Sequence, residues 1–100
     1  MSDIDSGAVA GARAFLLGIH KTLAFVEDDS EESIVDVRVQ FVDGGFEFHS
    51  GDASYDTDHR GGWGYGAVSK YDNASDLAQL AYDLVAEALE DYAEHGAAEE

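Results

Sequence analysis

One segment of the chain, residues 49 to 59, gathers side chains of the types that bind metal ions. Imidazole and carboxylate groups ligate zinc or manganese, and carboxylate oxygens alone suit calcium or magnesium. The groups in this segment belong to His49, Asp52, Asp56, Asp58 and His59. Their spacing matches no established metal motif, and a calcium loop beginning at Asp52 would lack the glycine and the glutamate that an EF-hand requires. We interpret the segment as a polar, turn-rich loop that binds no metal and no other cofactor.

Acid–base chemistry is the second kind of reaction that this part of the chain could support. His59 stands beside Arg60, and Tyr55 and Asp58 are close to it in the sequence. A general base also needs a neighbour that orients it and a pocket that holds the substrate. The chain has no G-x-S-x-G nucleophile motif, and its glycine-rich stretch 61–66 is neither a Walker nor a Rossmann pattern, because no helix opens directly after it. The sequence therefore predicts no catalytic residues and a protein that is not an enzyme.

Acidic residues dominate the chain and are the strongest indication of its partners. The 22 Asp and Glu residues outnumber the 5 Lys and Arg residues and give a formal net charge of −17. Like charges four residues apart oppose helix formation, so local helix stability does not account for the acids near the C-terminus. We predict a first contact face at Asp83, Glu87, Glu90, Asp91 and Glu94, and a second at Glu27, Asp28, Asp29, Glu31 and Glu32.

This charge restricts the classes of partner. A strongly anionic protein will not bind DNA, RNA or an acidic membrane surface directly. It will be attracted to basic surfaces, which include the grooves that hold nucleic acid. The chain has no cysteine, its first six residues do not form a signal peptide, and its apolar runs are too short to span a membrane. We therefore expect a cytoplasmic protein whose partner is a basic nucleic-acid-binding protein.

Aromatic residues form another candidate contact. Trp63, Tyr65 and Tyr71, with Arg60 and Lys70 close by, resemble a base-stacking platform with basic edges. The net charge opposes direct binding of nucleic acid, and we expect Trp63 to pack in the core. If the rings are exposed, a protein partner is expected, because aromatic residues and arginine are the usual anchors of protein interfaces. The candidate aromatic contact comprises Trp63, Tyr65 and Arg60.

Two helices must position these groups. Apolar residues recur at alternating steps of three and four over residues 7–26, which predicts a helix with its N-cap at Asp5 or Ser6. A second helix is expected to begin after Asn73, which is a good N-cap, and to end at Gly96. The acidic residues of this second helix lie away from its apolar stripe.

Three strands are expected between the helices, where the apolar period changes to two. They are predicted at 33–42, 46–49 and 62–70, with a hairpin turn at 43–45 and a polar loop at 50–61. In the third strand rings alternate with glycines, so one face carries rings and the other is nearly bare backbone. Glycine inside a strand often marks the close approach of another backbone.

These elements predict a single α+β domain over residues 1–100, with frayed ends at 1–6 and 97–100. The order is α-β-β-β-α. We expect a three-stranded antiparallel meander with both helices packed on one face of the sheet.

Two resemblances accompany this interpretation. The segment Ser50–Gly64 resembles part of small uncharacterised proteins encoded by phages and mobile elements, and this likeness implies no activity. As a small, acidic, cysteine-free α/β protein, the chain also resembles phage anti-CRISPR and anti-restriction proteins that mimic DNA. That second likeness lies in composition and layout, so no motif residue is carried over from it. It implies an inhibitor located in the host cytosol.

Charge and resemblance together predict a non-enzymatic inhibitor that binds a CRISPR-Cas or restriction complex through an acidic, DNA-mimicking face. Two alternatives stay open. In one, the chain is a halophile domain whose acidic residues cover all exposed faces. In the other, it is an interaction module that uses the aromatic face around Trp63. A homodimer formed through Gly11 and Gly18, or through the glycine-backed third strand, also stays open.

Overall fold

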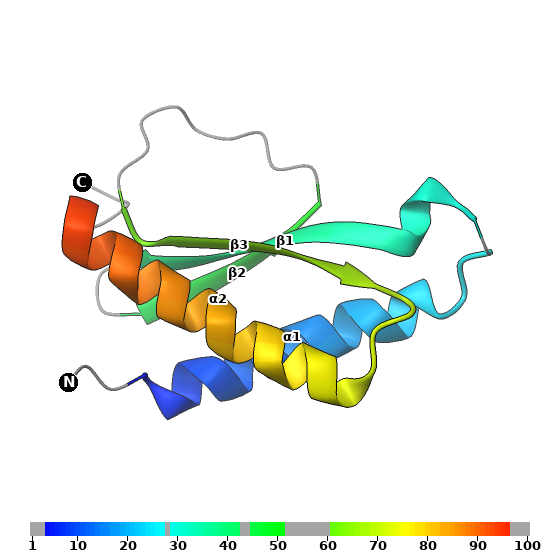
Figure 1. Ribbon diagram of the computed structural model, residues 1–100, viewed down its shortest axis with the longest axis horizontal. Coiled ribbons are helices and arrows are strands. Elements are labelled where there is room, and N and C mark those ends of the chain that lie inside the picture. Colours follow the sequence, from blue (N-terminus) through cyan, green and yellow to red (C-terminus); the bar gives the residue numbers. More distant parts are fainter. Residues whose placement is uncertain (1–3, 28, 43–44, 52–60, 97–100) are drawn as a thin grey trace.

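The computed structural model describes residues 4–27, 29–42, 45–51 and 61–96 (Figure 1). Its elements are α1 (Ser6–Leu23), the short 3-10 helix η1 (Glu31–Ser33), β1 (Ile34–Val42), β2 (Gly45–Ser50), β3 (Trp63–Ser69) and α2 (Ala74–His95). This order confirms the α+β class and the α-β-β-β-α sequence of elements. Frayed ends were expected at 1–6 and 97–100. Residues 1–3 and 97–100 lie outside the described residues, whereas Ile4 packs against the core, Asp5 caps α1 and Ser6 begins it. Within the described ranges, no helix is long and apolar enough to cross a membrane.

Helix α1 begins where the sequence predicts and ends three residues earlier than expected. The Asp5 carboxylate is the N-cap and accepts two backbone hydrogen bonds from the first turn, at 2.9 and 3.1 Å. After Leu23 the chain leaves the helix through tight turns, in which the Val26 N–H donates to the Leu23 carbonyl at 2.9 Å. Val26 still packs against the core. Because Val26 is apolar and lies at the helical spacing, the predicted helix extended to residue 26, past the end of α1.

Helix α2 has both of the predicted caps. The Asn73 side chain accepts a hydrogen bond from the Asp76 N–H at 2.9 Å. At the other end Gly96 adopts a φ of 86°, a conformation that favours glycine, and its N–H donates to the Tyr92 carbonyl at 2.7 Å. The helix is 22 residues long, so it runs the full length of the sheet (Figure 1).

The three strands are antiparallel, but they do not form the expected meander. The strand order is β2-β1-β3, so β3 pairs with β1 and not with β2. Val39 of β1 lies between Phe48 of β2 and Gly64 of β3. The nine-residue β1 is the longest strand, and its inward valines Val37 and Val39 are fully buried, as suits a central position. Twelve residues separate β2 from β3 in the sequence, which is enough for β3 to lie on the other edge of β1.

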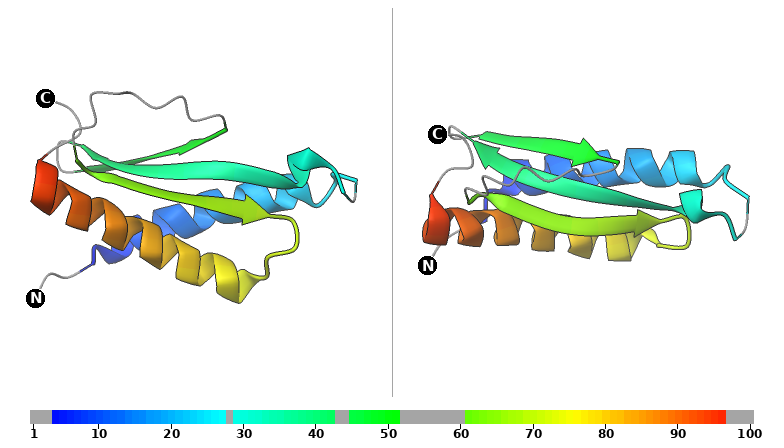
Figure 2. Two further views of the ribbon diagram at one scale, coloured as in Figure 1. Left: turned by 45° about the horizontal axis from the view of Figure 1, so that its top comes forward. Right: turned by 90° about the horizontal axis from the view of Figure 1, so that it is seen from above.

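Both helices cover one face of the sheet, as expected, and the core lies between these two layers (Figure 2). Side chains from both helices and from the sheet meet there, including a contact of Phe41 with Tyr92 at 4.8 Å between ring centroids. The core residues are Ala8, Ala12, Leu16, Leu23, Val37, Val39, Val68, Leu77, Ala81, Leu84, Val85 and Ala88. Within residues 4–27, 29–42, 45–51 and 61–96, no helix covers the other face of the sheet, which we call the helix-free face.

Strand β3 turns its glycines toward α2. A Cβ atom on Gly64 would overlap the backbone carbonyl of Leu84, and one on Gly66 would lie 3.0 Å from the Leu84 side chain. The bare backbone expected on this face is therefore confirmed, and it allows α2 to pack directly on β3. The same alternation sends the Trp63 and Tyr65 side chains to the helix-free face.

Candidate functional site

The acidic residues of α2 form one continuous stripe. They are Asp76, Asp83, Glu87, Glu90, Asp91 and Glu94. At about 100° of rotation per residue, all of them fall within an arc of roughly 100° around the helix axis. At ~1.5 Å of rise per residue, the stripe is about 27 Å long. All but the half-buried Asp91 are exposed. We call this set the acidic stripe.

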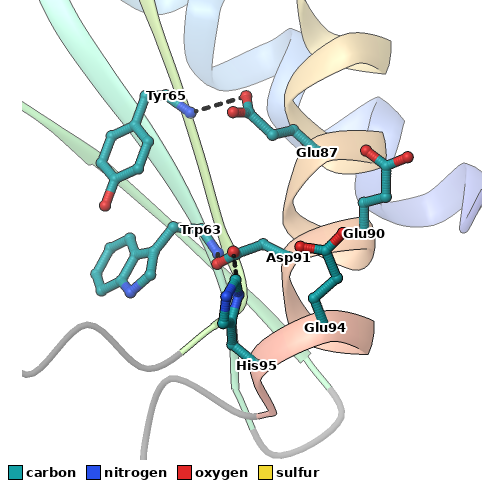
Figure 3. A pocket seen from close by; sticks show the side chains of 7 residues that line it. All are labelled: Trp63, Tyr65, Glu87, Glu90, Asp91, Glu94 and His95. Atoms are coloured by element: carbon teal, nitrogen blue, oxygen red, sulfur yellow. Dashed lines mark hydrogen bonds and ion pairs between the residues drawn. The ribbon is translucent and has the colours of Figure 1, made fainter.

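Two members of the acidic stripe are bonded to the edge of β3. The Trp63 N–H donates to Oδ2 of Asp91 at 3.1 Å, and the Tyr65 N–H donates to Oε1 of Glu87 at 3.2 Å (Figure 3). These N–H groups point away from β1, because alternate residues of an edge strand bond to its only neighbour. The stripe therefore lies on the flank of α2 beside β3. Two of its carboxylates accept hydrogen bonds from backbone N–H groups at the edge of the sheet.

The sequence contains a signal for these bonds in the spacing of the residues, which net charge does not reveal. Trp63 and Tyr65 are two residues apart on a strand, a distance of about 6.7 Å. Glu87 and Asp91 are four residues apart on a helix, a distance of ~6 Å. Because these two distances are similar, a helix that runs antiparallel to the edge strand can place one of these carboxylates beside each outward N–H. Sequence spacing indicates this match only once the strand is known to be an edge.

Asp91 also anchors the last turn of α2. Its Oδ1 atom lies 2.9 Å from Nδ1 of His95, while Oδ2 holds the Trp63 N–H. We expect Asp91→Ala to remove both bonds and to lower the free energy of unfolding by about 1–3 kcal/mol, because the partly buried Trp63 N–H loses its acceptor. Urea unfolding followed by circular dichroism measures the change.

Glu94→Ala is the matched control for this prediction. Glu94 belongs to the same stripe and is exposed. Within the described part of the chain, it has no hydrogen bond or ion pair to another residue. The control removes the same unit of charge, so we expect its free energy of unfolding to stay close to that of the wild type. Equal effects of the two substitutions would show that the Asp91 bonds do not stabilise the fold.

A groove of about 420 Å³ runs over the edge of β3, with the rings on one side of the strand and the acidic stripe on the other (Figure 3). Its lining residues are Trp63, Tyr65, Glu87, Glu90, Asp91, Glu94 and His95. Four of the five acids of the first predicted contact face therefore line this groove. Trp63 and Tyr65, the two described members of the predicted aromatic contact, line it as well. Asp83 lies on the same stripe, outside the groove.

The rings at the groove belong to the helix-free face of the sheet. Trp63 and Tyr65 are nearly parallel, with an interplanar angle of 15° and centroids 6.0 Å apart. The guanidinium carbon of Arg38 lies 5.2 Å from the centroid of the Trp63 ring, within cation–π range. The expectation that Trp63 packs in the core is wrong. At Gly64 and Gly66 the close approach of α2 leaves no room for a larger side chain on the inner face of β3, and the rings of Trp63 and Tyr65 occupy the outer face.

The second predicted acidic contact face is separate from the acidic stripe. Its described members Glu27, Asp29, Glu31 and Glu32 lie around η1, at the opposite end of the molecule from the C-terminal end of α2 (Figure 1). The longest dimension of the protein is 40 Å. The two acidic groups therefore do not form one patch. Asp28 lies outside the described residues.

The predicted stacking platform is also divided. Tyr71 and Lys70 follow the far end of β3, where Lys70 Nζ donates to the Val26 carbonyl and lies 5.5 Å from the Tyr71 ring centroid. Arg60 lies outside the described residues. The platform that remains at the groove is the pair Trp63 and Tyr65.

The chemistry expected for residues 49–59 falls almost wholly outside the described residues, which include only His49, Ser50 and Gly51 of this segment. His49 Nε2 lies 3.1 Å from Oε1 of Gln40 and 3.7 Å from Oε1 of Glu47 on the helix-free face. In the part of the chain that the structure describes, no three His, Asp or Glu side chains are grouped closely enough to hold a metal ion.

Comparison of the chain with protein-family models, with curated proteins and with solved structures finds no match. The groove and the acidic stripe are therefore interpreted from their own geometry. Carboxylates on one wall and aromatic rings on the other are suited to a cationic ligand.

Proposed function

We propose that this protein is a non-enzymatic inhibitor that binds a nucleic-acid-binding complex, of the CRISPR-Cas or restriction type, through the acidic stripe. The observation that supports this proposal is the segregation of charge between the two helices. Helix α1 contains no Asp or Glu, whereas α2 contains the whole acidic stripe and no Lys or Arg. The negative charge on the helix layer is therefore concentrated on one flank of one element.

The physical basis of the proposed inhibition is competition for a basic groove. A stripe about 27 Å long covers roughly eight phosphate spacings of a DNA strand, at ~3.4 Å each. Six carboxylates over that length carry about three-quarters of the charge density of one strand. They would pair with the Lys and Arg residues of the groove and release its bound ions, as DNA does. Electrostatic attraction would also accelerate the encounter.

The same segregation favours a binding function over adaptation to salt. Acidic residues that serve only a saline habitat are expected on every exposed face, yet the exposed charged residues of α1 are Arg13 and Lys21. The aromatic interaction module is not a separate alternative at this site. Its rings Trp63 and Tyr65 line the groove together with the acidic stripe, so one partner would contact both.

The experiment that tests the proposed function measures the binding of labelled target DNA to purified CRISPR effector and restriction complexes. Fluorescence anisotropy is recorded as the protein is added at ~0.15 M salt, where the Debye length is about 8 Å. We expect the protein to displace DNA from at least one complex, and to do so less effectively as the salt concentration rises. Undiminished DNA binding by every complex, even at large excess of the protein, would overturn the proposal.

A further inference from the structure

The groove over the β3 edge has two walls of different chemistry, and each wall attracts a cation in its own way. One wall is the parallel pair of rings, Trp63 and Tyr65. The electron-rich face of an aromatic ring attracts a cation, and tryptophan does so most strongly. The chain already uses this attraction, because the guanidinium of Arg38 lies over the Trp63 ring at 5.2 Å. The ring thus accepts a planar cation in this protein.

The other wall carries negative charge that the described chain does not neutralise. Glu90 and Glu94 are exposed and lie one helical turn apart, and neither has a hydrogen bond or an ion pair to another described residue. Glu87 and Asp91 each use one carboxylate oxygen to hold a β3 N–H. His95 is the only group with basic character in the lining, and it already contacts Asp91 at 2.9 Å.

The spacing of these carboxylates excludes a small ion and favours an extended one. No described group of three carboxylates and imidazoles is close enough to ligate a metal ion. The groove volume of about 420 Å³ is typical of sites that bind organic groups. A ligand that fills it must therefore carry its positive charge on a longer, partly apolar body that can lie against the rings.

We propose that the groove binds the side chain of an arginine residue on the partner protein, with the guanidinium between Glu90 and Glu94 and its plane against the Trp63–Tyr65 pair. This inference rests on the proposed function, in which the partner presents a basic groove. Arginine fits better than lysine, because a guanidinium is planar, stacks on rings and donates two parallel hydrogen bonds to a carboxylate. An ammonium group is a compact, strongly hydrated charge that does neither.

The test uses the single tryptophan of the chain as the reporter, since Trp63 lines the groove. The full chain is titrated with a blocked hexa-arginine peptide and, separately, with a hexa-lysine peptide of equal charge, and Trp63 fluorescence is recorded. We expect hexa-arginine to bind about tenfold more tightly than hexa-lysine. Amide chemical shifts from a 15N-labelled sample locate the contact, and we expect the largest changes at residues 63–65 and 87–95.

Two double variants separate the groove from the general charge. Glu90→Gln with Glu94→Gln should weaken hexa-arginine binding about tenfold and abolish the preference over hexa-lysine. Glu31→Gln with Glu32→Gln removes the same charge at the opposite end of the molecule and should change the affinity less than about twofold. Circular dichroism confirms that both variants are folded. Equal affinities for the two peptides, or equal effects of the two double variants, would overturn the arginine assignment.

The peptide titration contains no nucleic-acid-binding complex, so its result is independent of the inhibition assay. Arginine selectivity at the groove without displacement of DNA from any complex would overturn the proposed function and retain the arginine site. Displacement of DNA without arginine selectivity would retain the function and overturn this site.

Discussion

Replacement of Gly64 by alanine is expected to destabilise the fold strongly. The new Cβ atom would overlap the backbone carbonyl of Leu84 in α2. A backbone atom cannot rotate away, so β3 and α2 would have to separate. Over-packing of this kind costs about 1–3 kcal/mol and sometimes more, which is a large part of the 5–15 kcal/mol that typically stabilises a small domain. Urea unfolding measures the loss.

Gly18→Ala is the matched control, because it adds the same methyl group to a glycine with open space around it. No atom lies within 4 Å of the position that its Cβ would take. Gly18 is inside α1, where alanine is favoured over glycine by about 1 kcal/mol. We therefore expect Gly18→Ala to raise the free energy of unfolding. If Gly64→Ala were as stable as Gly18→Ala, the direct packing of α2 on β3 would be refuted.

Charge reversal on the acidic stripe is expected to have the largest effect on partner binding. The variant Asp83→Lys, Glu90→Lys, Glu94→Lys turns three exposed carboxylates into ammonium groups that face a basic surface. Like charges placed together across an interface cost several kcal/mol, so we expect the affinity for an inhibited complex to fall at least about 100-fold. The substitutions spare Glu87 and Asp91, and the edge of β3 therefore keeps its hydrogen bonds.

The control for charge reversal is Glu31→Lys with Glu32→Lys in η1. These residues belong to the second acidic contact face, at the other end of the 40 Å molecule. If binding depends on the acidic stripe, this control should weaken it by less than about tenfold. Similar losses for the two variants, once the number of reversed charges is considered, would mean that net charge and not the stripe governs binding.

The local pattern of the sequence predicts most of the elements. Alternation over β1, the caps Asp5 and Asn73, and the bare inner face of β3 follow from rules that act over a few residues. Those rules cannot choose the pairing partner of β3, because register with β1 or β2 depends on contacts between residues far apart in the sequence. The prediction of a meander was therefore wrong in the pairing of β3, which bonds to β1 and not to β2.

The candidate site was predicted in composition but not in arrangement. Charge and aromatic content predict Glu90, Glu94, Trp63 and Tyr65 as contacts, and the structure places all four at one groove. The sequence predicts Asp91 only as one acid of the first contact face, whereas its carboxylate also bonds to the start of β3 and to the last turn of α2. That role depends on β3 being an edge strand next to α2. No local pattern in the sequence indicates this position of β3.

If the acidic stripe and nucleic acid occupy the same basic groove, they cannot be bound to one complex at the same time. A complex that the protein inhibits is mixed with both the protein and a target DNA, each at saturating concentration, and mass photometry counts the assemblies. We expect complexes that hold either DNA or the protein and never both, in proportions set by the two affinities. A stable assembly of the complex, DNA and the protein together would show that the two do not share a groove.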